Sequence, residues 1–266
     1  MPEYKIYIYK MSPTHPHSST KTFETRSLIF TVKLLLIRHA DPDYEHDSLT
    51  PKGWKEAALL ADRITKLDVR DFYCSPLGRA RDTAGVTLNR LHKNAAVFDW
   101  LQEFPARILD PDDGEKRIAW DLMPSYWTNR PDLYDKDKWY LDSIMKSGNT
   151  EEIYKGVTEG IDSLLDTYGY RRDGMIYRTE GGNKDTIVIF CHLGVELAIL
   201  SHLLGIATPV LWQGFFVAPS SVTILATEER KKGEVYFRCK ALGDTSHLYM
   251  GNEPISNSGF FSETYE

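Results

Sequence analysis

The feature that most constrains the fold is a set of short apolar segments that each end abruptly at polar residues. Residues 28–37 and 186–191 are two such segments, and they stop at Arg38-His39 and at His192. Unbroken apolar runs of this length, rich in branched side chains, are typical of strands buried on both faces of a parallel sheet. The pattern therefore predicts central strands whose carboxyl ends carry charged or titratable groups.

Helices are predicted between these strands. Thr50-Pro51 combines a hydroxyl N-cap with proline at the first helical position, and it predicts a helix to about residue 66. After a short strand at 69–74, Ser75-Pro76 repeats the signal and predicts a helix to about residue 91. Further helices are expected at 149–168 and 194–204, and late strands at 222–226 and 235–240. We predict an α/β fold, a three-layer sandwich with a mostly parallel central sheet and helices on both faces.

The chain divides into a main domain and less regular parts. We expect an N-terminal extension at 1–27, a domain at 28–250 and a loose, polar C-terminal tail at 251–266. The extension contains a candidate edge strand at 4–9, and its His15 and His17 are expected to be solvated rather than to bind metal. Residues 104–148 form an aromatic insertion with short helices, which is either a lid over a site or a satellite hydrophobic cluster.

Composition limits the function classes. The 266 residues carry a formal net charge of -6, which argues against nucleic acid as a partner. Three cysteines give no disulfide framework and fit a reducing compartment. The longest apolar stretch, 187–207, is interrupted by His192, Glu196 and His202, so we expect no membrane span. With no secretory signal evident, the expected location is the cytoplasm.

Polar groups follow three predicted strands: Arg38-His39 after the first, Ser75 and Arg79 after the second, and His192 after the third. Carboxyl ends of parallel strands form the edge where open α/β sheets bind ligands. Guanidinium groups and helix N-termini suit a phosphate monoester, and a neutral imidazole is a competent nucleophile toward phosphorus. We therefore expect a phosphate-handling site with His39 as nucleophile.

A leaving alkoxide also needs a proton. Glu103, in the sequence WLQEF, follows a short, mostly apolar segment and is a candidate general acid for the first step and general base for the second.

Four blocks carry a family resemblance. LLLIRHADPDY, CSPLGRARDTA, LQEF and IVIFCHLGVELAILSHLLG match, in order and spacing, the motifs of the histidine phosphatase superfamily, also called phosphoglycerate-mutase-like. The resemblance covers roughly residues 32–250. It implies a phosphohistidine at His39, a phosphate pocket of Arg38, Arg79 and His192, proton transfer by Glu103, and no metal or other cofactor.

The sequence also departs from the family pattern. Ala40 stands where the family has glycine after the catalytic histidine, and Asp41 and Asp43 add negative charge nearby, so they either fit a particular substrate or point away. A cysteine-based phosphatase is not expected, because arginine does not stand six residues after any of the three cysteines.

The leading hypothesis is a phosphatase acting on a small phosphomonoester, with a homodimer as a candidate assembly. Two alternatives stay open, a phosphoglycerate-type mutase and a catalytically silent phosphate-binding module. The sequence does not identify the substrate, whose choice we expect to depend on residues 104–148.

Overall fold

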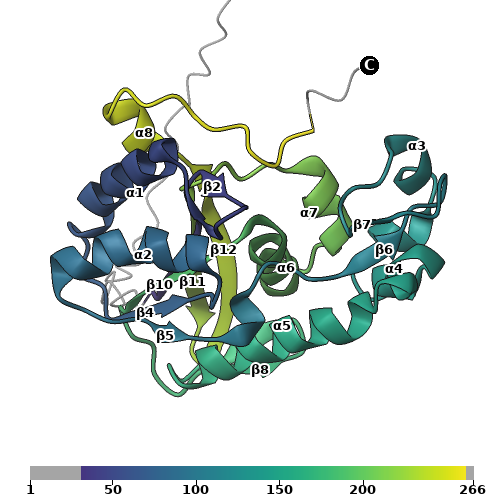
Figure 1. Cartoon of the computed structure of the whole chain (residues 1–266). Coiled ribbons are helices and arrows are strands. Elements are labelled where there is room, and N and C mark those ends of the chain that lie inside the picture. The colour runs from purple at the N-terminus through teal and green to yellow at the C-terminus, as the bar shows by residue number, and fades with distance from the viewer. Residues whose placement is uncertain (1–30, 262–266) are drawn as a thin grey trace, which may run out of the picture.

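The computed structural model describes residues 31–261 and consists of a sheet with helices packed on both faces (Figure 1). The strand expected at 4–9, His15 and His17 lie outside the described residues. Within residues 31–261 the main sheet has eight strands, in the spatial order β5-β4-β10-β1-β11-β12-β9-β8. In that order their bounds are Ala96–Val97, Asp71–Cys74, Thr186–Cys191, Lys33–Arg38, Val222–Lys231, Glu234–Asp244, Ile176–Arg178 and Arg171–Asp173.

The sheet is mixed. Strands β5, β4, β10 and β1 run parallel to one another, whereas β11, β12, β9 and β8 each pair antiparallel with the preceding strand in the sheet. The antiparallel part arises because β11 and β12 are longer than the sequence predicts and are joined by a tight turn. Gly233 in that turn has a φ of +77°, a conformation that glycine adopts without steric cost. The predicted α/β fold is confirmed, and its parallel strands are those that lead to the predicted site.

Alternate residues of the central strands point to opposite layers. Leu34 and Leu36 of β1 belong to a core shared with α5 (Thr150–Asp166) and α6 (Leu193–Leu204). Leu35 and Ile37 belong to the core under α1 (Pro51–Ile64) and α2 (Gly78–Leu91). Both faces of the sheet are therefore buried, which accounts for the continuous apolar runs in the sequence.

The two predicted helix starts differ in outcome. Thr50 caps α1 as expected, because its Oγ1 accepts a hydrogen bond from the Gly53 N–H at 3.0 Å. The cap predicted at Ser75 is wrong by two residues. Helix α2 begins at Gly78, and Leu77 occupies its cap position without a side-chain bond. The hydroxyl of Ser75 instead contacts His192.

The insertion at 104–148 contains only short elements. They are α3, α4, two 3₁₀ helices and the hairpin β6–β7, at Pro124–Trp127, Ser143–Ser147, Pro131–Tyr134, Trp139–Leu141, Arg107–Leu109 and Lys116–Ile118. Its Trp139 is fully buried, and the ring centroid lies 5.3 Å from that of Trp212 in α7 (Thr208–Gly214). The insertion is thus packed onto the main core rather than forming a separate cluster.

The expectation of a loose tail is wrong for residues 251–261. After α8 (Ser246–Met250) the chain crosses the carboxyl edge of the sheet, along the top of Figure 1. Lys52 Nζ contacts Glu253 Oε1 at 2.8 Å, and Ser256 Oγ donates to Asp41. The remaining short elements are β2, β3 and one 3₁₀ helix, at Pro42–Asp43, Ser48–Leu49 and Asp99–Leu101.

Candidate active site

Five residues proposed from the sequence lie together at the carboxyl edge of β1, β4 and β10. The ring centroids of His39 and His192 are 5.1 Å apart. Arg38 and Arg79 lie close enough to both imidazoles, and to Glu103, to act on their pKa values. Because the three strands are parallel neighbours, residues distant in sequence reach one edge.

His39 is held in one tautomer. Its side chain is 1% exposed, and Nδ1 lies 2.8 Å from the backbone oxygen of Ala40. A carbonyl oxygen only accepts, so Nδ1 carries the proton and Nε2 keeps its lone pair. Burial, reinforced by the positive charge of Arg38, holds the pKa of His39 well below its usual 6.5. The imidazole is therefore neutral and nucleophilic.

His192 is the cap residue of α6, directly after β10, and is also buried. Its Nε2 lies 2.7 Å from Ser75 Oγ, which also accepts a hydrogen bond from the Leu77 N–H. Burial is the largest cause that lowers the pKa of His192 well below 6.5, followed by His39 and the arginines. Ser75, which the sequence suggests both as a helix cap and as a polar group at this edge of the sheet, thus orients the second histidine. Because the two residues are 117 positions apart, no local sequence pattern indicates this contact.

Arg38 ends β1 with a buried guanidinium group that is 2% exposed. Its Nη1 donates to the Val217 oxygen at 2.7 Å, and its Nη2 donates to the Ser258 oxygen at 2.8 Å. The C-terminal segment 253–261 therefore reaches the site directly, a contribution that the polar composition of the tail did not indicate.

Arg79 is positioned by an aspartate that the sequence analysis did not single out. Asp47 Oδ1 accepts from Arg79 Nη1 at 2.6 Å, while its Oδ2 accepts from the Gly78 N–H. Asp47 thus fixes both the arginine and the start of α2. The two neighbouring acidic residues point away, since Asp41 accepts from Thr50 Oγ1 and Ser256 Oγ, and Asp43 pairs with His46.

Three buried nitrogen atoms at the site lack a hydrogen-bond partner among the described residues. They are Nε of Arg38, Nε of Arg79 and Nδ1 of His192. A buried polar group without a partner costs about 1–3 kcal/mol, so such atoms are uncommon unless a ligand satisfies them. Two guanidinium groups with these atoms suit a dianion of the size of phosphate.

Glu103 supplies a carboxyl group to the same site. Its Oε1 accepts hydrogen bonds from the N–H groups of Phe104 and Gly194, each at 2.9 Å. Burial raises the pKa of Glu103, although both backbone donors and the arginines oppose that change. A carboxyl group with a raised pKa is able to retain a proton and give it to a leaving group.

Other chemistries find less support. The thiols of Cys74 and Cys191 are buried, and burial raises the pKa of Cys74 to about 12, so it is a poor nucleophile. Between residues 31 and 261, no group of three or more histidine, cysteine, aspartate or glutamate side chains is placed to hold a metal ion. In the same part of the chain, every helix is too short or too polar to traverse a bilayer.

Known proteins share this architecture. Phosphoserine phosphatase 1 of Hydrogenobacter thermophilus is 26% identical over 212 residues, covering 75% of this chain and 89% of the relative. A mycobacterial glucosyl-3-phosphoglycerate phosphatase superposes with a TM-score of 0.55 at 18% identity, covering 80% and 99% of the two chains. A phosphoserine phosphatase mutant from Entamoeba histolytica, in complex with phosphoserine, gives 0.53 at 19% identity, covering 82% and 99%.

These structural likenesses establish the fold, and the family model establishes the relationship. The model of the histidine phosphatase superfamily, branch 1, matches residues 34–239, a span that includes all five residues of the candidate site. On that match, the chain belongs to the histidine phosphatase superfamily.

Proposed function

We propose that this chain is a phosphatase that hydrolyses a small phosphomonoester through a phosphohistidine intermediate on His39. The observation that carries the proposal is a buried neutral imidazole, with its Nε2 lone pair free, beside two guanidinium groups. Relatives named as phosphatases match over 212 residues or more, whereas a phosphoglycerate mutase of Thermoplasma acidophilum matches over only 79 residues, and this difference in coverage favours hydrolysis.

The first half-reaction transfers the phosphoryl group to the protein. Nε2 of His39 attacks phosphorus, and the bond from phosphorus to the leaving oxygen breaks. Arg38 and Arg79 neutralise the charge on the non-bridging oxygens, with His192 as a further donor. Glu103 gives its proton to the leaving oxygen, so the alcohol departs neutral and Glu103 becomes a carboxylate.

The second half-reaction restores the free site. The Glu103 carboxylate removes a proton from a water molecule, whose oxygen attacks the phosphorus of phosphohistidine. The phosphorus–nitrogen bond breaks, inorganic phosphate leaves, and both His39 and Glu103 return to their starting states.

A generic aryl phosphate, assayed with a chelator present, tests the proposal. We expect the wild-type protein to be active and His39→Ala to lose at least 10³-fold in kcat, because it lacks the nucleophile. His46→Ala is the matched control, since this histidine is exposed on the surface and pairs with Asp43. Wild-type protein quenched during turnover should carry acid-labile phosphate on His39. Activity that survives in His39→Ala rules out the assigned nucleophile.

The same preparation separates the alternatives. A mutase would isomerise 3-phosphoglycerate faster than it hydrolyses it. A silent binding module would neither hydrolyse the aryl phosphate nor acquire phosphate on His39.

A further inference from the structure

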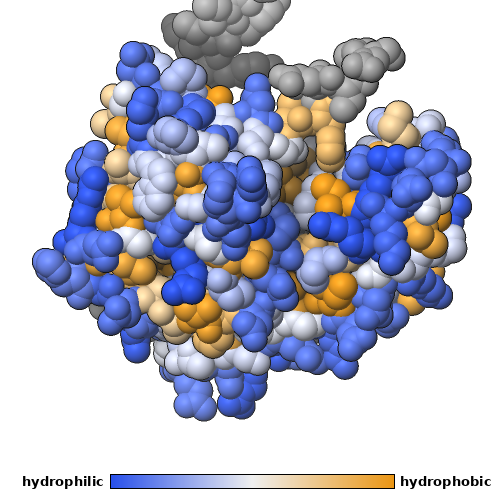
Figure 2. Space-filling view, in the orientation of Figure 1, coloured by the Kyte–Doolittle hydropathy of each residue, from blue (hydrophilic) through white to orange (hydrophobic). Residues whose placement is uncertain are grey.

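A pocket of about 400 Å³ lies beside the candidate active site. Its size is within the range usual for small-molecule sites. Aromatic residues dominate its lining, namely Trp120, Trp212, Phe215, Phe216, Phe260 and Phe261. No lining residue carries a charged side chain, although the protein as a whole is 26% charged. Figure 2 shows apolar residues gathered in the hollow between the insertion and the rest of the molecule.

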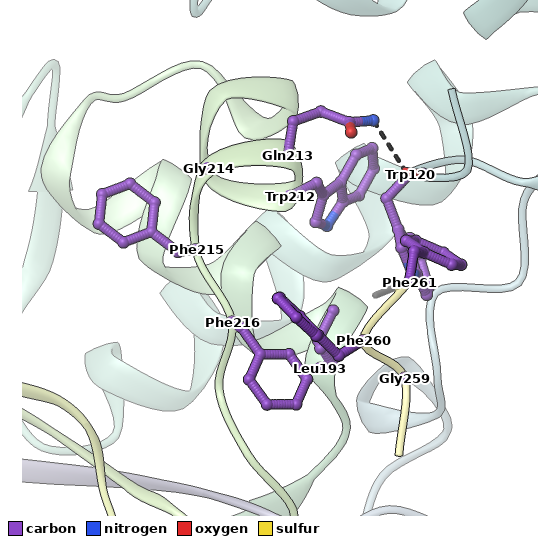
Figure 3. A pocket seen from close by; sticks show the side chains of 10 residues that line it. All are labelled: Trp120, Leu193, Trp212, Gln213, Gly214, Phe215, Phe216, Gly259, Phe260 and Phe261. Carbon is purple, nitrogen blue, oxygen red and sulfur yellow. Dashed lines mark hydrogen bonds between the residues drawn. The ribbon is translucent and has the colours of Figure 1, made fainter. Parts of the chain in front are cut away.

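The aromatic rings come from three separate segments of the chain and converge. The centroids of Phe216 and Phe260 are 5.1 Å apart, and those of Trp120 and Trp212 are 5.6 Å apart. Figure 3 shows these four rings around a common space, whereas the ring of Phe215 is directed away from them. The pocket is therefore built jointly by the insertion, the residues around the end of α7 and the C-terminal segment.

The pocket adjoins the residues that bind phosphate. The guanidinium carbon of Arg38 lies 5.7 Å from the centroid of the Phe216 ring. On the other wall, Gly259 approaches Arg38 so closely that an added Cβ would lie 2.9 Å from Nη2. A phosphate held by Arg38 would thus have the pocket next to it.

The pocket also adjoins the proposed proton donor. Trp120 and Glu103 meet at Gly194, where an added Cβ would lie 2.4 Å from the Trp120 ring and 2.7 Å from Glu103 Oε1. Glu103 protonates the leaving oxygen in the proposed reaction, so the leaving group departs on the side of Trp120. The pocket therefore lies where the alcohol part of the substrate extends from phosphorus.

Two side-chain donors of the pocket lining already have backbone partners. The indole N–H of Trp212 donates to the Gly194 oxygen, and the side-chain amide of Gln213 donates to the Trp120 oxygen, both at 2.9 Å. An ammonium or carboxylate group placed among these rings would lose water and find no charged side chain in the lining, which is costly. Flat apolar groups would gain contacts with the rings.

We propose that this pocket binds the alcohol moiety of the substrate and selects an uncharged aromatic or apolar group. The inference rests on the proposed function. It limits the expected substrates to phosphate esters of uncharged aromatic or apolar alcohols and excludes amino-acid and glycerate phosphates. The aromatic rings of Trp120, Phe216 and Phe260 then determine specificity, while Arg38 and Arg79 bind the phosphate common to all substrates.

The test compares benzyl phosphate with O-phospho-L-serine. Both are alkyl phosphates, so the comparison depends little on the intrinsic reactivity of the leaving group. We expect kcat/KM for benzyl phosphate to exceed that for phosphoserine at least tenfold. The variant Phe260→Ala/Phe261→Ala should lower kcat/KM for benzyl phosphate about tenfold, mainly through KM, because apolar contacts of this size give roughly 10–200-fold discrimination. Phosphoserine turnover and competitive inhibition by inorganic phosphate should change less than twofold.

Tyr249→Ala is the matched control, because Tyr249 is an exposed aromatic residue outside the pocket. This variant should leave kcat/KM unchanged for both substrates. Equal or better turnover of phosphoserine by the wild type, or an equal loss for both substrates in the double variant, overturns the inference and leaves the proposed phosphatase intact. Failure to hydrolyse either ester, or the aryl phosphate, overturns the proposed function itself.

Discussion

Individual side chains around His39 differ in how much solvent they have lost and in which charges they face. The carboxyl groups of Glu103 and Glu196 and the two imidazoles lie near buried guanidinium groups. Burial is the largest influence on the pKa of each of these carboxyl groups and imidazoles. Burial keeps both histidines neutral and raises the pKa of both carboxyl groups, and for Glu103 this shift favours the protonated form that the proposed first step requires.

Replacing Glu103 tests its role as proton donor. We expect Glu103→Gln to lower kcat for benzyl phosphate by 10²–10⁴-fold, since an alkoxide leaves poorly without a proton. With p-nitrophenyl phosphate, whose leaving group is stable as an anion, the first-turnover burst of p-nitrophenol should slow less than tenfold, although hydrolysis of the phosphohistidine still loses its general base. Steady-state rates over a pH series provide the measurement. The wild-type rate on benzyl phosphate should fall as pH rises through the raised pKa of Glu103, and this decline should be missing in the variant. Equal losses in the first-turnover rate of His39 phosphorylation by the two substrates would argue for a structural role.

The effect of burial on Glu196 can be tested separately, through the free energy of unfolding. It is fully buried, and burial raises its pKa to about 8 against the opposing effects of Thr223 and Arg38. A carboxyl group whose pKa is higher in the folded state stabilises the fold below its unfolded pKa, near 4.5, and loses that contribution as pH rises to about 8. Glu196→Gln should therefore gain in free energy of unfolding relative to wild type across this interval, by up to about 5 kcal/mol, since one pKa unit corresponds to about 1.4 kcal/mol.

Denaturant unfolding at several pH values measures this difference. Glu159→Gln, an exposed change on α5, serves as the control and should shift stability by less than about 0.5 kcal/mol at every pH. A Glu196→Gln difference that does not vary between pH 5 and 8 would show that the carboxyl group is ionised in the folded protein.

At the scale of elements, the start of α6 joins several parts of the site. His192 precedes the helix, and Gly194 in its first turn donates its N–H to Glu103 and packs against the Trp120 ring. A side chain at position 194 would occupy space that Glu103 and Trp120 already fill. Glycine here is required by close approach and not by an unusual backbone conformation.

Gly194→Ala should therefore be destabilising, although alanine favours helices. We expect a loss of about 1–3 kcal/mol in the free energy of unfolding, typical of overpacking, and a lower kcat through displacement of Glu103. Gly156→Ala is the matched control, because Gly156 lies in the middle of α5 with nothing within 4 Å of an added Cβ. It should stabilise by about 0.5–1 kcal/mol. Thermal unfolding of both variants checks the contrast, and a neutral Gly194→Ala would contradict the close packing.

Elements and residues with a local sequence pattern could be predicted, and those that depend on long-range contacts could not. The buried parallel strands and the Thr50 cap have strong local patterns, and the five site residues stand immediately after strands or within family motifs. By contrast, Asp47 and Ser75 act through contacts 32 and 117 residues away, which no local pattern encodes. Likewise, Gly259 and Phe260 are in a polar segment whose packing depends on tertiary contacts with Arg38 and Phe216.

Over the whole molecule, the site is assembled from parts that pack only in the folded state. Arg38 comes from β1, Arg79 from α2, His192 from the end of β10, and the segment 253–261 crosses above them. The unfolded chain has no comparable set of converging cations. A ligand bound here should therefore stabilise the entire domain by mass action.

Inorganic phosphate should raise the melting temperature for this reason. At a concentration one hundred times its Kd, phosphate contributes about 2.7 kcal/mol, or roughly 5–10 °C for a domain of this size. Arg79→Met should lose most of the increase, because it removes one of the two guanidinium groups from the site. Arg81→Met, an exposed change on the same helix, should retain it and controls for net charge. Differential scanning fluorimetry with phosphate, and with sodium chloride at equal ionic strength, gives the measurement without depending on turnover. If phosphate raises the melting temperature of Arg79→Met and Arg81→Met equally, it acts as a general salt. The two guanidinium groups then do not form a phosphate-binding site.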